Sequence, residues 1–275
     1  MNREQTMNRL QDRVVIITGA GAGIGRATAQ RAASEGARVV VAEISQERGQ
    51  AVVEEIIAAS GRALFVPTDV AEPDQIEALY DRTLAEWGQV DAVINNAYGP
   101  VEMVQADGDL TDVEDDTWNR VMETTLRSVF LSSRRAAREM IKAGRGGAIV
   151  NLASVNGLYA YGLVAYSTAK GGIVALTRCA AMQYASQGIR INAIAPGTVS
   201  TESTRPFMEK PEIKKELDAM YGRGSVGEPE EIAAGIIFLA SDDASFVNGE
   251  VLIVDGGLTV GPTRFGLTDE IAGDG

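Results

Sequence analysis

Hydrophobic positions along this 275-residue chain occur in two kinds of run, short unbroken ones and longer periodic ones. The unbroken runs are rich in β-branched residues, which is typical of strands buried on both faces of a parallel sheet. The longer runs place apolar residues on one helical face and commonly end at glycine, which is typical of amphipathic helices. The pattern predicts strands over 13–18, 37–42, 62–68, 91–97, 147–153, 189–195 and 250–255. It predicts helices over 24–36, 46–60, 73–88, 116–143, 163–186 and 229–240.

Strands and helices therefore alternate along nearly the whole chain. A parallel pair of strands needs a crossover, and a helical crossover lies against a face of the sheet. The alternation predicts an α/β fold, in which a parallel sheet is covered by helices on both faces and the crossovers are right-handed. No low-complexity linker or internal repeat interrupts the pattern, so residues 1–275 are interpreted as a single domain.

The charge of the chain limits its partners. Its 38 acidic and 25 basic side chains give a formal net charge of −13, which disfavours nucleic acid and anionic membrane surfaces as partners. No apolar run approaches the roughly 18 residues that suggest a membrane-spanning helix. The first residues are polar and lack the apolar centre of a signal peptide. We expect a cytoplasmic protein.

Histidine is absent from the chain, and Cys179 is its only cysteine. These counts exclude an internal disulfide and the usual zinc ligand sets, so no metal site is predicted. They also exclude nucleophile systems that depend on histidine, so acid–base chemistry near neutral pH must use other groups. Cys179 lies in an apolar helical stretch and is interpreted as a small core residue.

The sequence TGAGAGIG (18–25) lies directly between the first predicted strand and the first predicted helix. Glycine permits a tight turn and lets a phosphate approach the backbone, and the helix that follows presents free N–H groups and its positive end. The turn is therefore interpreted as a dinucleotide site, and the alternative is a tight connection without a ligand. Its cofactor-binding candidates are Gly19, Gly23, Ile24 and Gly25.

Glu43 ends the second strand, 18 positions beyond Gly25. A carboxylate at this distance accepts hydrogen bonds from the adenosine ribose hydroxyls and repels a 2′-phosphate. No lysine or arginine occurs at 19–25 or 44–45 to bind such a phosphate. NAD is predicted in preference to NADP, and a solvated glutamate at a strand end is the simpler alternative.

Seven motifs follow one another along the chain: TGAGAGIG, DV (69–70), NNA (95–97), Ser154, YSTAK (166–170), PGTVST (196–201) and DGG (255–257). On these motifs the chain resembles the short-chain dehydrogenase/reductase family, in the branch with the shorter chains, over a core of 13–257. The resemblance implies a Rossmann fold with a doubly wound parallel sheet of seven strands, in the order 3-2-1-4-5-6-7. It also implies hydride transfer between a nicotinamide cofactor and an alcohol or carbonyl group.

The catalytic candidates are Ser154, Tyr166 and Lys170. Oxidation of a secondary alcohol removes a hydride from carbon and a proton from oxygen, and a side chain must accept the proton. Tyrosine has an ordinary pKa near 10, which is too high for a base at neutral pH, but a nearby cation lowers it. Lys170 lies one helical turn after Tyr166 and is expected to supply this cation and to reach the nicotinamide ribose. Ser154 is expected to hold the substrate oxygen beside Tyr166.

The chain departs from the family pattern near this site. Thr125 stands where the family usually has an asparagine that supports a water chain from the lysine to solvent. We expect Thr125 to bind a water or its own helix carbonyl, with an altered proton relay. Tyr98 replaces a common glycine and is expected either to border the nicotinamide end of the pocket or to be a surface ring. The segment between Ser154 and Tyr166 is one position shorter than is common, which is expected to reshape the substrate pocket.

The resemblance implies further cofactor contacts at the ends of the other strands. The adenine ring is expected after the third strand, the cofactor cleft after the fourth and the nicotinamide amide after the sixth. In that order the candidates are Asp69 and Val70, then Asn95 and Ala97, then Pro196, Gly197, Val199 and Thr201. A purely structural role is the alternative for each of them.

The segment 200–227 is interpreted as a lid over the substrate. Its aromatic and methionine side chains suit a small or medium, partly apolar alcohol or ketone. The substrate-binding candidates are Ser154, Tyr98, Tyr161 and Phe207, with Tyr159, Met208, Met220 and Tyr221 as further wall residues.

The family commonly forms tetramers through its two long helices and last strand, so a homotetramer is expected. Residues 258–275 form a C-terminal extension that is expected to cover a neighbouring subunit or to lack fixed structure.

Three other activities fit parts of the sequence. An NADPH-dependent carbonyl or 3-oxoacyl reductase would use the same fold and site, and a preference for NADPH in steady-state kinetics would identify it. A non-catalytic cofactor sensor needs no base such as Tyr166. An epimerase or dehydratase of the family usually has a longer substrate domain. Because NAD favours oxidation in a cell, the prediction is an NAD-dependent dehydrogenase of a secondary alcohol.

Overall fold

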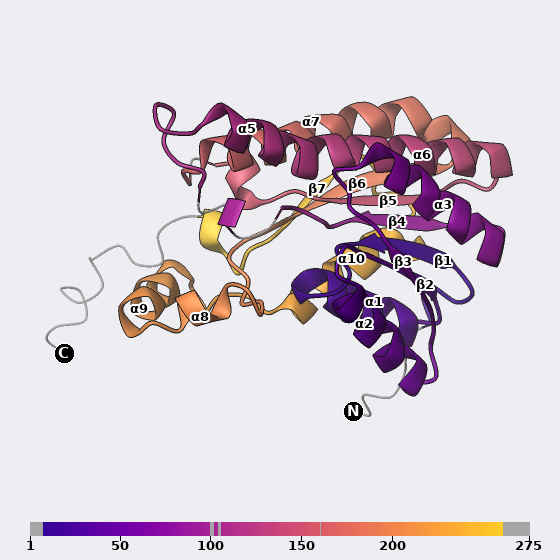
Figure 1. Ribbon diagram of the computed structural model, residues 1–275, viewed down its shortest axis with the longest axis horizontal. Coiled ribbons are helices and arrows are strands. Elements are labelled where there is room, and N and C mark those ends of the chain that lie inside the picture. Colours follow the sequence, from indigo (N-terminus) through magenta and orange to yellow (C-terminus); the bar gives the residue numbers. More distant parts are fainter. Residues whose placement is uncertain (1–7, 100–101, 104–105, 160, 261–275) are drawn as a thin grey trace, which may run out of the picture.

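The computed structural model describes residues 8–99, 102–103, 106–159 and 161–260. Seven strands form one sheet in the order β3-β2-β1-β4-β5-β6-β7, and each neighbouring pair is parallel (Figure 1). The predicted fold class and strand order are confirmed. The strands are β1 (Val14–Thr18), β2 (Arg38–Glu43), β3 (Arg62–Pro67), β4 (Ala92–Asn95), β5 (Gly147–Leu152), β6 (Ile189–Pro196) and β7 (Val251–Val254).

Helices cover both faces of the sheet (Figure 1). One face carries α1 (Gly23–Ser34), α2 (Gln46–Ala58) and α10 (Pro229–Ala240). The other face carries α3 (Pro73–Trp87), α6 (Ser128–Ala143) and α7 (Val164–Tyr184), and α5 (Asp115–Val121) lies on the same side (Figure 1) and packs against α7. This doubly wound arrangement explains why the strands are unbroken apolar runs in the sequence, because neither face of the sheet meets water.

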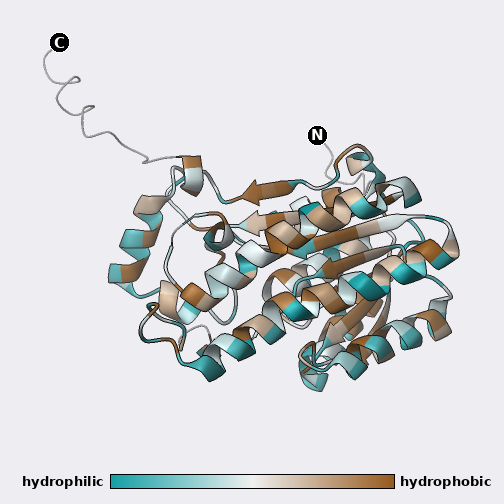
Figure 2. Cartoon of the chain, turned by 90° about the horizontal axis from the view of Figure 1, so that it is seen from above, coloured by the Kyte–Doolittle hydropathy of each residue, from teal (hydrophilic) through white to brown (hydrophobic). Residues whose placement is uncertain are grey.

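The core has two layers that share the sheet. All five residues of β1 are buried, and they alternate between the layers. Val15 and Ile17 pack with residues of α1, α2 and α10, whereas Val14 and Ile16 pack with residues of α3, α6 and α7. Figure 2 shows the hydropathy of each residue: the strands are mostly apolar, and the helices around them carry both apolar and polar residues.

The helix predicted over 116–143 is not one continuous α-helix. A π-helix, Met122–Arg127, separates α5 from α6. Two hydroxyls in this region bond to carbonyl oxygens one turn earlier: Thr124 Oγ1 donates to Arg120 at 2.8 Å, and Ser128 Oγ donates to Thr124 at 2.6 Å. Such bonds compete with the backbone ladder and bend helices. Apolar periodicity does not reveal this short change of backbone pitch, since the buried positions on either side keep their spacing.

The lid (200–227) is more regular than the sequence suggested. It contains α8 (Arg205–Met208) and α9 (Pro211–Met220), which lie away from the sheet in Figure 1.

Cys179 is exposed on α7, so its interpretation as a core residue was wrong. The apolar composition of α7 extends around the helix beyond the face that packs on the sheet, and Cys179 lies outside that face.

Of the C-terminal extension, Leu258–Val260 form a 3₁₀ turn, and 261–275 lie outside the described residues. In the part of the chain that the structure describes, no helix has both the length and the apolar character that a membrane crossing requires.

Candidate active site

The candidate site lies at the edge of the sheet where the strands end, which is where open α/β sheets bind ligands. The Gly-rich turn (18–25) follows β1, and backbone shape there depends on glycine. Gly19 and Gly23 have φ values of +64° and +50°, a region that side chains disfavour. A Cβ atom at Gly25 would overlap the carbonyl oxygen of Gly19. We call the turn and the N-terminus of α1 the anion cradle, because backbone N–H groups in such a place bind anions, the diphosphate of a dinucleotide among them.

Asn96 holds this turn from the neighbouring strand. Its amide Nδ2 donates to the carbonyl oxygens of Thr18 at 2.9 Å and Gly19 at 3.1 Å. The N–H groups of Asn96 and Ala97 both donate to Thr18 Oγ1 at 3.1 Å. Asn96 was not singled out from the sequence, although it is part of the NNA motif that carried the resemblance.

Glu43 is buried at the end of β2, and both of its carboxylate oxygens accept hydrogen bonds. Oε2 accepts from the N–H of Gly21 at 3.0 Å, and Oε1 accepts from the N–H of Ser45 at 3.1 Å. Oε1 also accepts from the guanidinium of Arg48 at 3.0 Å. Arg48 was not predicted as a partner of Glu43, because it lies outside both the Gly-rich turn and the two positions directly after Glu43. The first turn of α2 brings this side chain back to the strand end.

A carboxylate from the lid lies in the anion cradle. Glu202 Oε2 accepts from the N–H of Gly23, the first residue of α1, at 2.9 Å. Glu202 Oε1 lies 3.6 Å from the guanidinium of Arg26. Thr201 is close to Gly23, because a Cβ atom there would lie 3.0 Å from Thr201 Cγ2. The lid therefore uses a backbone donor that a bound diphosphate would also use.

Ser154, Tyr166 and Lys170 lie together where β5 ends. Ser154 Oγ accepts from the N–H of Asn156 at 3.2 Å and hydrogen-bonds the phenol of Tyr166. The ammonium nitrogen of Lys170 lies 5.5 Å from the centre of the Tyr166 ring. It donates to the carbonyl oxygen of Leu152 at 2.6 Å, which ties α7 to the end of β5. The three residues predicted as catalytic are thus brought together.

Burial disfavours the ionised forms of Tyr166 and Lys170. It raises the pKa of Tyr166 to about 12, although the hydrogen bond with Ser154 lowers that pKa. Burial also lowers the pKa of Lys170 to about 7. In the protein alone, burial outweighs the lowering of the phenol pKa that we expected from Lys170. Tyr166 therefore needs a further positive charge beside it before it can act as a base near neutral pH.

Thr125 lies in the π-helix and is fully buried. Its hydroxyl has no hydrogen-bond partner among the described residues, so it does not bond to a carbonyl of its own helix, which was one of the two expected arrangements. A buried polar atom without a protein partner is the kind of group that holds an ordered water. A water at Thr125 stays a prediction.

Asn95 points into the core between β4 and β5. Its amide Nδ2 donates to Ser133 Oγ at 3.0 Å and to Asn151 Oδ1 at 2.8 Å. Asn151 in turn donates to Thr177 Oγ1 at 3.0 Å. This network joins two strands to α6 and α7, so Asn95 contributes to the structure, and its contact with a cofactor stays a prediction.

The remaining cofactor candidates lie at strand ends, and their contacts to a cofactor stay predictions. Val70 and Ala97, together with Asn95, line a cavity of about 10 Å³, which is near the volume that one water needs. Asp69 Oδ1 accepts from the N–H of Ala71 at 2.9 Å and stabilises the turn after β3.

The loop after β6 is held by the end of the lid. Pro196 ends β6, and Val199 pairs with Gly227 in an isolated bridge. Tyr221 is buried, and its phenol oxygen accepts from the N–H of Thr198 at 2.7 Å. Tyr221 therefore supports the predicted nicotinamide loop, a role that the sequence did not suggest.

The substrate candidates differ in their distance from the catalytic phenol. Tyr98 is 46% exposed and lies close enough to Tyr166 to raise its pKa. Tyr161 is exposed, and its ring centre lies 6.5 Å from that of Tyr159. Phe207 is exposed on α8. Of the three, Tyr98 is the one that the structure brings next to Tyr166.

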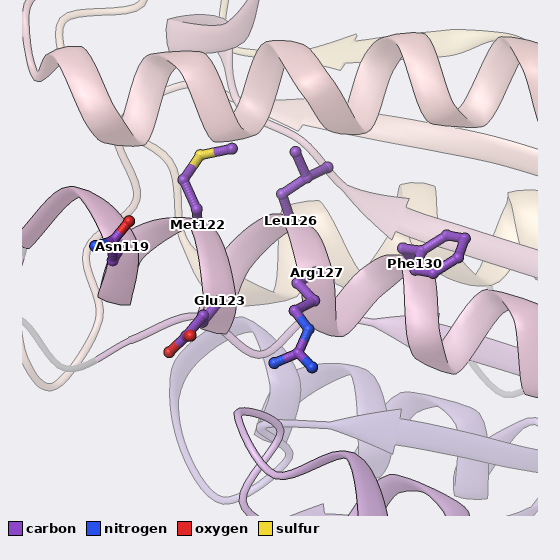
Figure 3. A pocket seen from close by; sticks show the side chains of 6 residues that line it. All are labelled: Asn119, Met122, Glu123, Leu126, Arg127 and Phe130. Carbon is purple, nitrogen blue, oxygen red and sulfur yellow. The ribbon is translucent and has the colours of Figure 1, made fainter.

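A groove of about 370 Å³ lies outside this site, on the helices α5 and α6 and the π-helix between them. Figure 3 shows Met122 and Leu126 directed to one side of the helix and Glu123 and Arg127 to the other. The lining residues are Asn119, Met122, Glu123, Leu126, Arg127 and Phe130, and none of them is a candidate for catalysis or cofactor binding.

Within the described ranges, no cluster of cysteine, aspartate and glutamate side chains could hold a metal ion.

The chain matches a known family model and is similar in sequence to several dehydrogenases. A family model described as enoyl-(acyl carrier protein) reductase matches residues 19–259. Cyclohexanol dehydrogenase of Acinetobacter sp. (strain SE19) is 39% identical over 253 residues, which cover 92% of this chain and 97% of that protein. Cis-4-hydroxycyclohexanecarboxylate dehydrogenase of Sinomonas cyclohexanicum is 41% identical over 249 residues, which cover 90% and 97%.

A solved structure has the same fold over nearly the same length. The crystal structure of a short-chain type dehydrogenase/reductase from Mycobacterium marinum matches with a TM-score of 0.84 and 30% sequence identity. The match covers 94% of this chain and 100% of that chain.

Proposed function

The chain belongs to the short-chain dehydrogenase/reductase family of oxidoreductases, and we propose that it oxidises a secondary alcohol to a ketone with NAD as the hydride acceptor. One observation carries the proposal. Ser154, Tyr166 and Lys170 lie together at the edge of the sheet that also carries the Gly-rich turn.

The bound nicotinamide supplies the hydride acceptor, and the side chains manage the proton. Ser154 holds the alcohol oxygen next to the phenol of Tyr166, which takes the hydroxyl proton as general base. Lys170 and the positive ring of oxidised nicotinamide together lower the pKa of the phenol from the high value that burial imposes. With a pKa of about 7, Lys170 can also release a proton at neutral pH.

The preference for NAD rests on Glu43. This carboxylate is buried at the end of β2 and bonded to the Gly-rich turn through the N–H of Gly21. A carboxylate in this place accepts hydrogen bonds from ribose hydroxyls and repels a 2′-phosphate. The ribose would compete with Ser45 and Arg48 for the same oxygens, so cofactor binding rearranges these contacts.

A cyclic secondary alcohol is the substrate class that we propose. Two relatives are named for the oxidation of ring alcohols, cyclohexanol and a hydroxycyclohexanecarboxylate. Tyr98, which lies close enough to Tyr166 to affect its pKa, provides a flat apolar surface that suits such a ring.

An NADPH-dependent reductase of carbonyl or 3-oxoacyl substrates is the second candidate. Two observations favour it. A relative from Thermotoga maritima that is 35% identical over 253 residues is named 3-oxoacyl-(acyl-carrier-protein) reductase. The guanidinium of Arg48 lies beside Glu43 and is half exposed, and guanidinium groups bind phosphates well.

We also propose that the protein is a cytoplasmic, single-domain homotetramer. The groove with apolar side chains at Met122, Leu126 and Phe130 lies on one of the two long helical stretches through which tetramers were expected. Phe130 is 43% exposed there, and Met182 is 83% exposed on α7. A pairing of α5–α6 and α7 between copies would cover these side chains.

The test is a panel of cyclic and open-chain secondary alcohols and ketones, assayed with NAD(H) and NADP(H) by the absorbance of the reduced cofactor. We expect turnover of ring alcohols with NAD. Tyr166→Phe should lower kcat by about 10²–10⁴, since it removes the proton acceptor, while NAD still binds. Tyr184→Phe, at the far end of the same helix, is the control. Substantial turnover by Tyr166→Phe would refute the general-base role.

A further inference from the structure

The helix that carries Tyr166 begins without a capping residue of its own. The first N–H groups of an α-helix have no partner within the helix, and a polar side chain at the preceding residue usually binds one of them. In α7 that residue is Leu163, which has no acceptor and adopts a left-handed φ of +56°. The first turn of α7 therefore depends on partners from elsewhere in the chain.

The loop before α5 supplies these partners. Asp107 Oδ1 accepts from the N–H of Ala165 at 3.1 Å, and its Oδ2 accepts from the N–H of Tyr166 at 2.8 Å. The N–H of Val164 donates to the carbonyl oxygen of Gly108 at 3.3 Å. All three N–H groups of the first turn are thus bound by two adjacent residues that lie more than fifty positions earlier.

The buried carboxylate of Asp107 depends on its contacts with the start of α7. Its side chain is 6% exposed, and no basic side chain among the described residues forms a salt bridge with it. A buried carboxylate is costly unless it is well bonded. Here two charge-assisted hydrogen bonds and the positive end of α7 compensate its charge. Moving α7 away from this position would leave the carboxylate buried and unpaired.

The same loop region also packs against the first two turns of α7. Met103 is buried in a cluster with Ala165 and Ala169, and Tyr166 packs against this cluster. Asp107 and Met103 hold the start of the helix, while Lys170 holds its second turn to β5 through Leu152. Tyr166 lies between these two attachments.

We propose that Asp107 is a positioning residue for Tyr166: it caps α7 from outside and sets the position of the phenol relative to Ser154 and Lys170. The inference rests on the proposed function, because it assigns Asp107 a role in proton transfer by Tyr166. Without this cap, the first turn frays and the phenol no longer stays within hydrogen-bond distance of Ser154.

The test compares Asp107→Ala and Asp107→Asn with Asp109→Asn. Asp109 is the matched control, since it is an exposed aspartate in the same loop. Three quantities are measured on each protein well below its melting temperature: kcat with a ring alcohol, the Kd for NAD and the pH profile of kcat. We expect Asp107→Ala to lower kcat by about tenfold or more, because displacements of about 1 Å at reacting groups can cost about 10²-fold. The Kd for NAD should stay that of the control, because the Gly-rich turn is built from β1 and α1.

The kcat of Asp107→Asn distinguishes a positioning role from a general loss of stability. Asp107→Asn keeps one acceptor oxygen, so its kcat should lie between those of Asp107→Ala and the wild type. A kcat of Asp107→Ala equal to that of the control overturns the proposal, and so does an equal loss in kcat and NAD binding. If Asp107→Ala does not fold, Asp107→Asn is judged by the same comparison. Absence of turnover in the wild type would instead refute the proposed function.

Discussion

At the residue scale, the site contains two buried groups, Tyr166 and Lys170, and burial disfavours the ionised form of each. The ammonium of Lys170 is 3% exposed and donates to the carbonyl oxygen of Leu152. The phenol of Tyr166 lies beside it with a raised pKa. Each group would favour the ionised form of the other, so the pair is sensitive to any charge that a ligand adds.

The buried lysine has a consequence for stability. Burial lowers the pKa of Lys170 from 10.5 to about 7. Between these two values the unfolded chain binds more protons than the folded protein, so this group makes the free energy of unfolding rise with pH. In Lys170→Met this contribution is absent. The difference in the free energy of unfolding, variant minus wild type, should fall from pH 7 to pH 10.5. Urea denaturation at a series of pH values measures it, with Lys142→Met as the control, and a difference that grows with pH contradicts the assignment.

The preference between NAD and NADP is expected to depend on two single residues, Glu43 and Arg48. Glu43→Ala removes the carboxylate that Arg48 binds and leaves the guanidinium free for a 2′-phosphate. The ratio of kcat/KM for NADP to that for NAD should rise by about tenfold to a hundredfold, since each tenfold corresponds to about 1.4 kcal/mol. Steady-state kinetics with both cofactors measure this ratio. Adding Arg48→Ala should abolish the gain, and an unchanged ratio in Glu43→Ala would place the selectivity elsewhere.

At the scale of elements, the lid contacts α1 at the anion cradle, where we propose that the diphosphate of the cofactor binds. The lid reaches the anion cradle through Glu202, and this carboxylate bonds the N–H of Gly23 and lies near Arg26. A dinucleotide diphosphate is negatively charged and needs the same donors. The lid must therefore move, or Glu202 must turn away, when the cofactor binds.

Glu202→Ala should tighten NAD binding, because the diphosphate no longer displaces a carboxylate. The contact is largely exposed, so the Kd should fall by only about two- to fivefold, as for other surface ion pairs. Fluorescence titration with NAD measures the Kd. Glu209→Ala changes an exposed glutamate of the same lid and is the control. Weaker binding by Glu202→Ala would mean that this side chain assists the cofactor.

At the scale of the whole molecule, the two faces of the sheet have different surroundings. The layer of α1, α2 and α10 carries the cofactor turn and the cradle, whereas α6 and α7 carry exposed Phe130 and Met182 on the opposite layer (Figure 1). Assembly through α5–α6 and α7 would bury the groove shown in Figure 3 and leave the cofactor cradle open.

Phe130→Glu should therefore dissociate the proposed tetramer into smaller species, because it places a charge in an apolar contact. Sedimentation velocity measures the assembly state. Ile57→Glu changes an apolar residue on α2, at the opposite face, that is 56% exposed against 43% for Phe130, and it should leave the assembly intact. A tetramer that survives Phe130→Glu, or a wild type that is monomeric, contradicts the proposed interface.

Local sequence patterns predicted the seven strands, their order and most of the helices that cover the sheet. β1 and β2 were predictable because residues buried on both faces must all be apolar. The Gly-rich turn was predictable because its φ values of +64° at Gly19 and +50° at Gly23 suit glycine. The combination of Tyr166 and Lys170 was visible because one helical turn separates them. Each of these signals depends on residues that are near one another in the chain.

Only the tertiary structure decided which distant groups meet. Glu202 and Gly23 are 179 positions apart, and Asp107 lies 59 positions before Tyr166. Such contacts depend on how packed elements lie against one another, and no local pattern of polar and apolar residues encodes them. The raised pKa of Tyr166 has the same origin, because burial is a property of the whole fold. The candidate residues Ser154, Tyr166 and Lys170 could therefore be proposed from the sequence, whereas the contacts of Asp107 and Glu202 and the burial of the phenol could not.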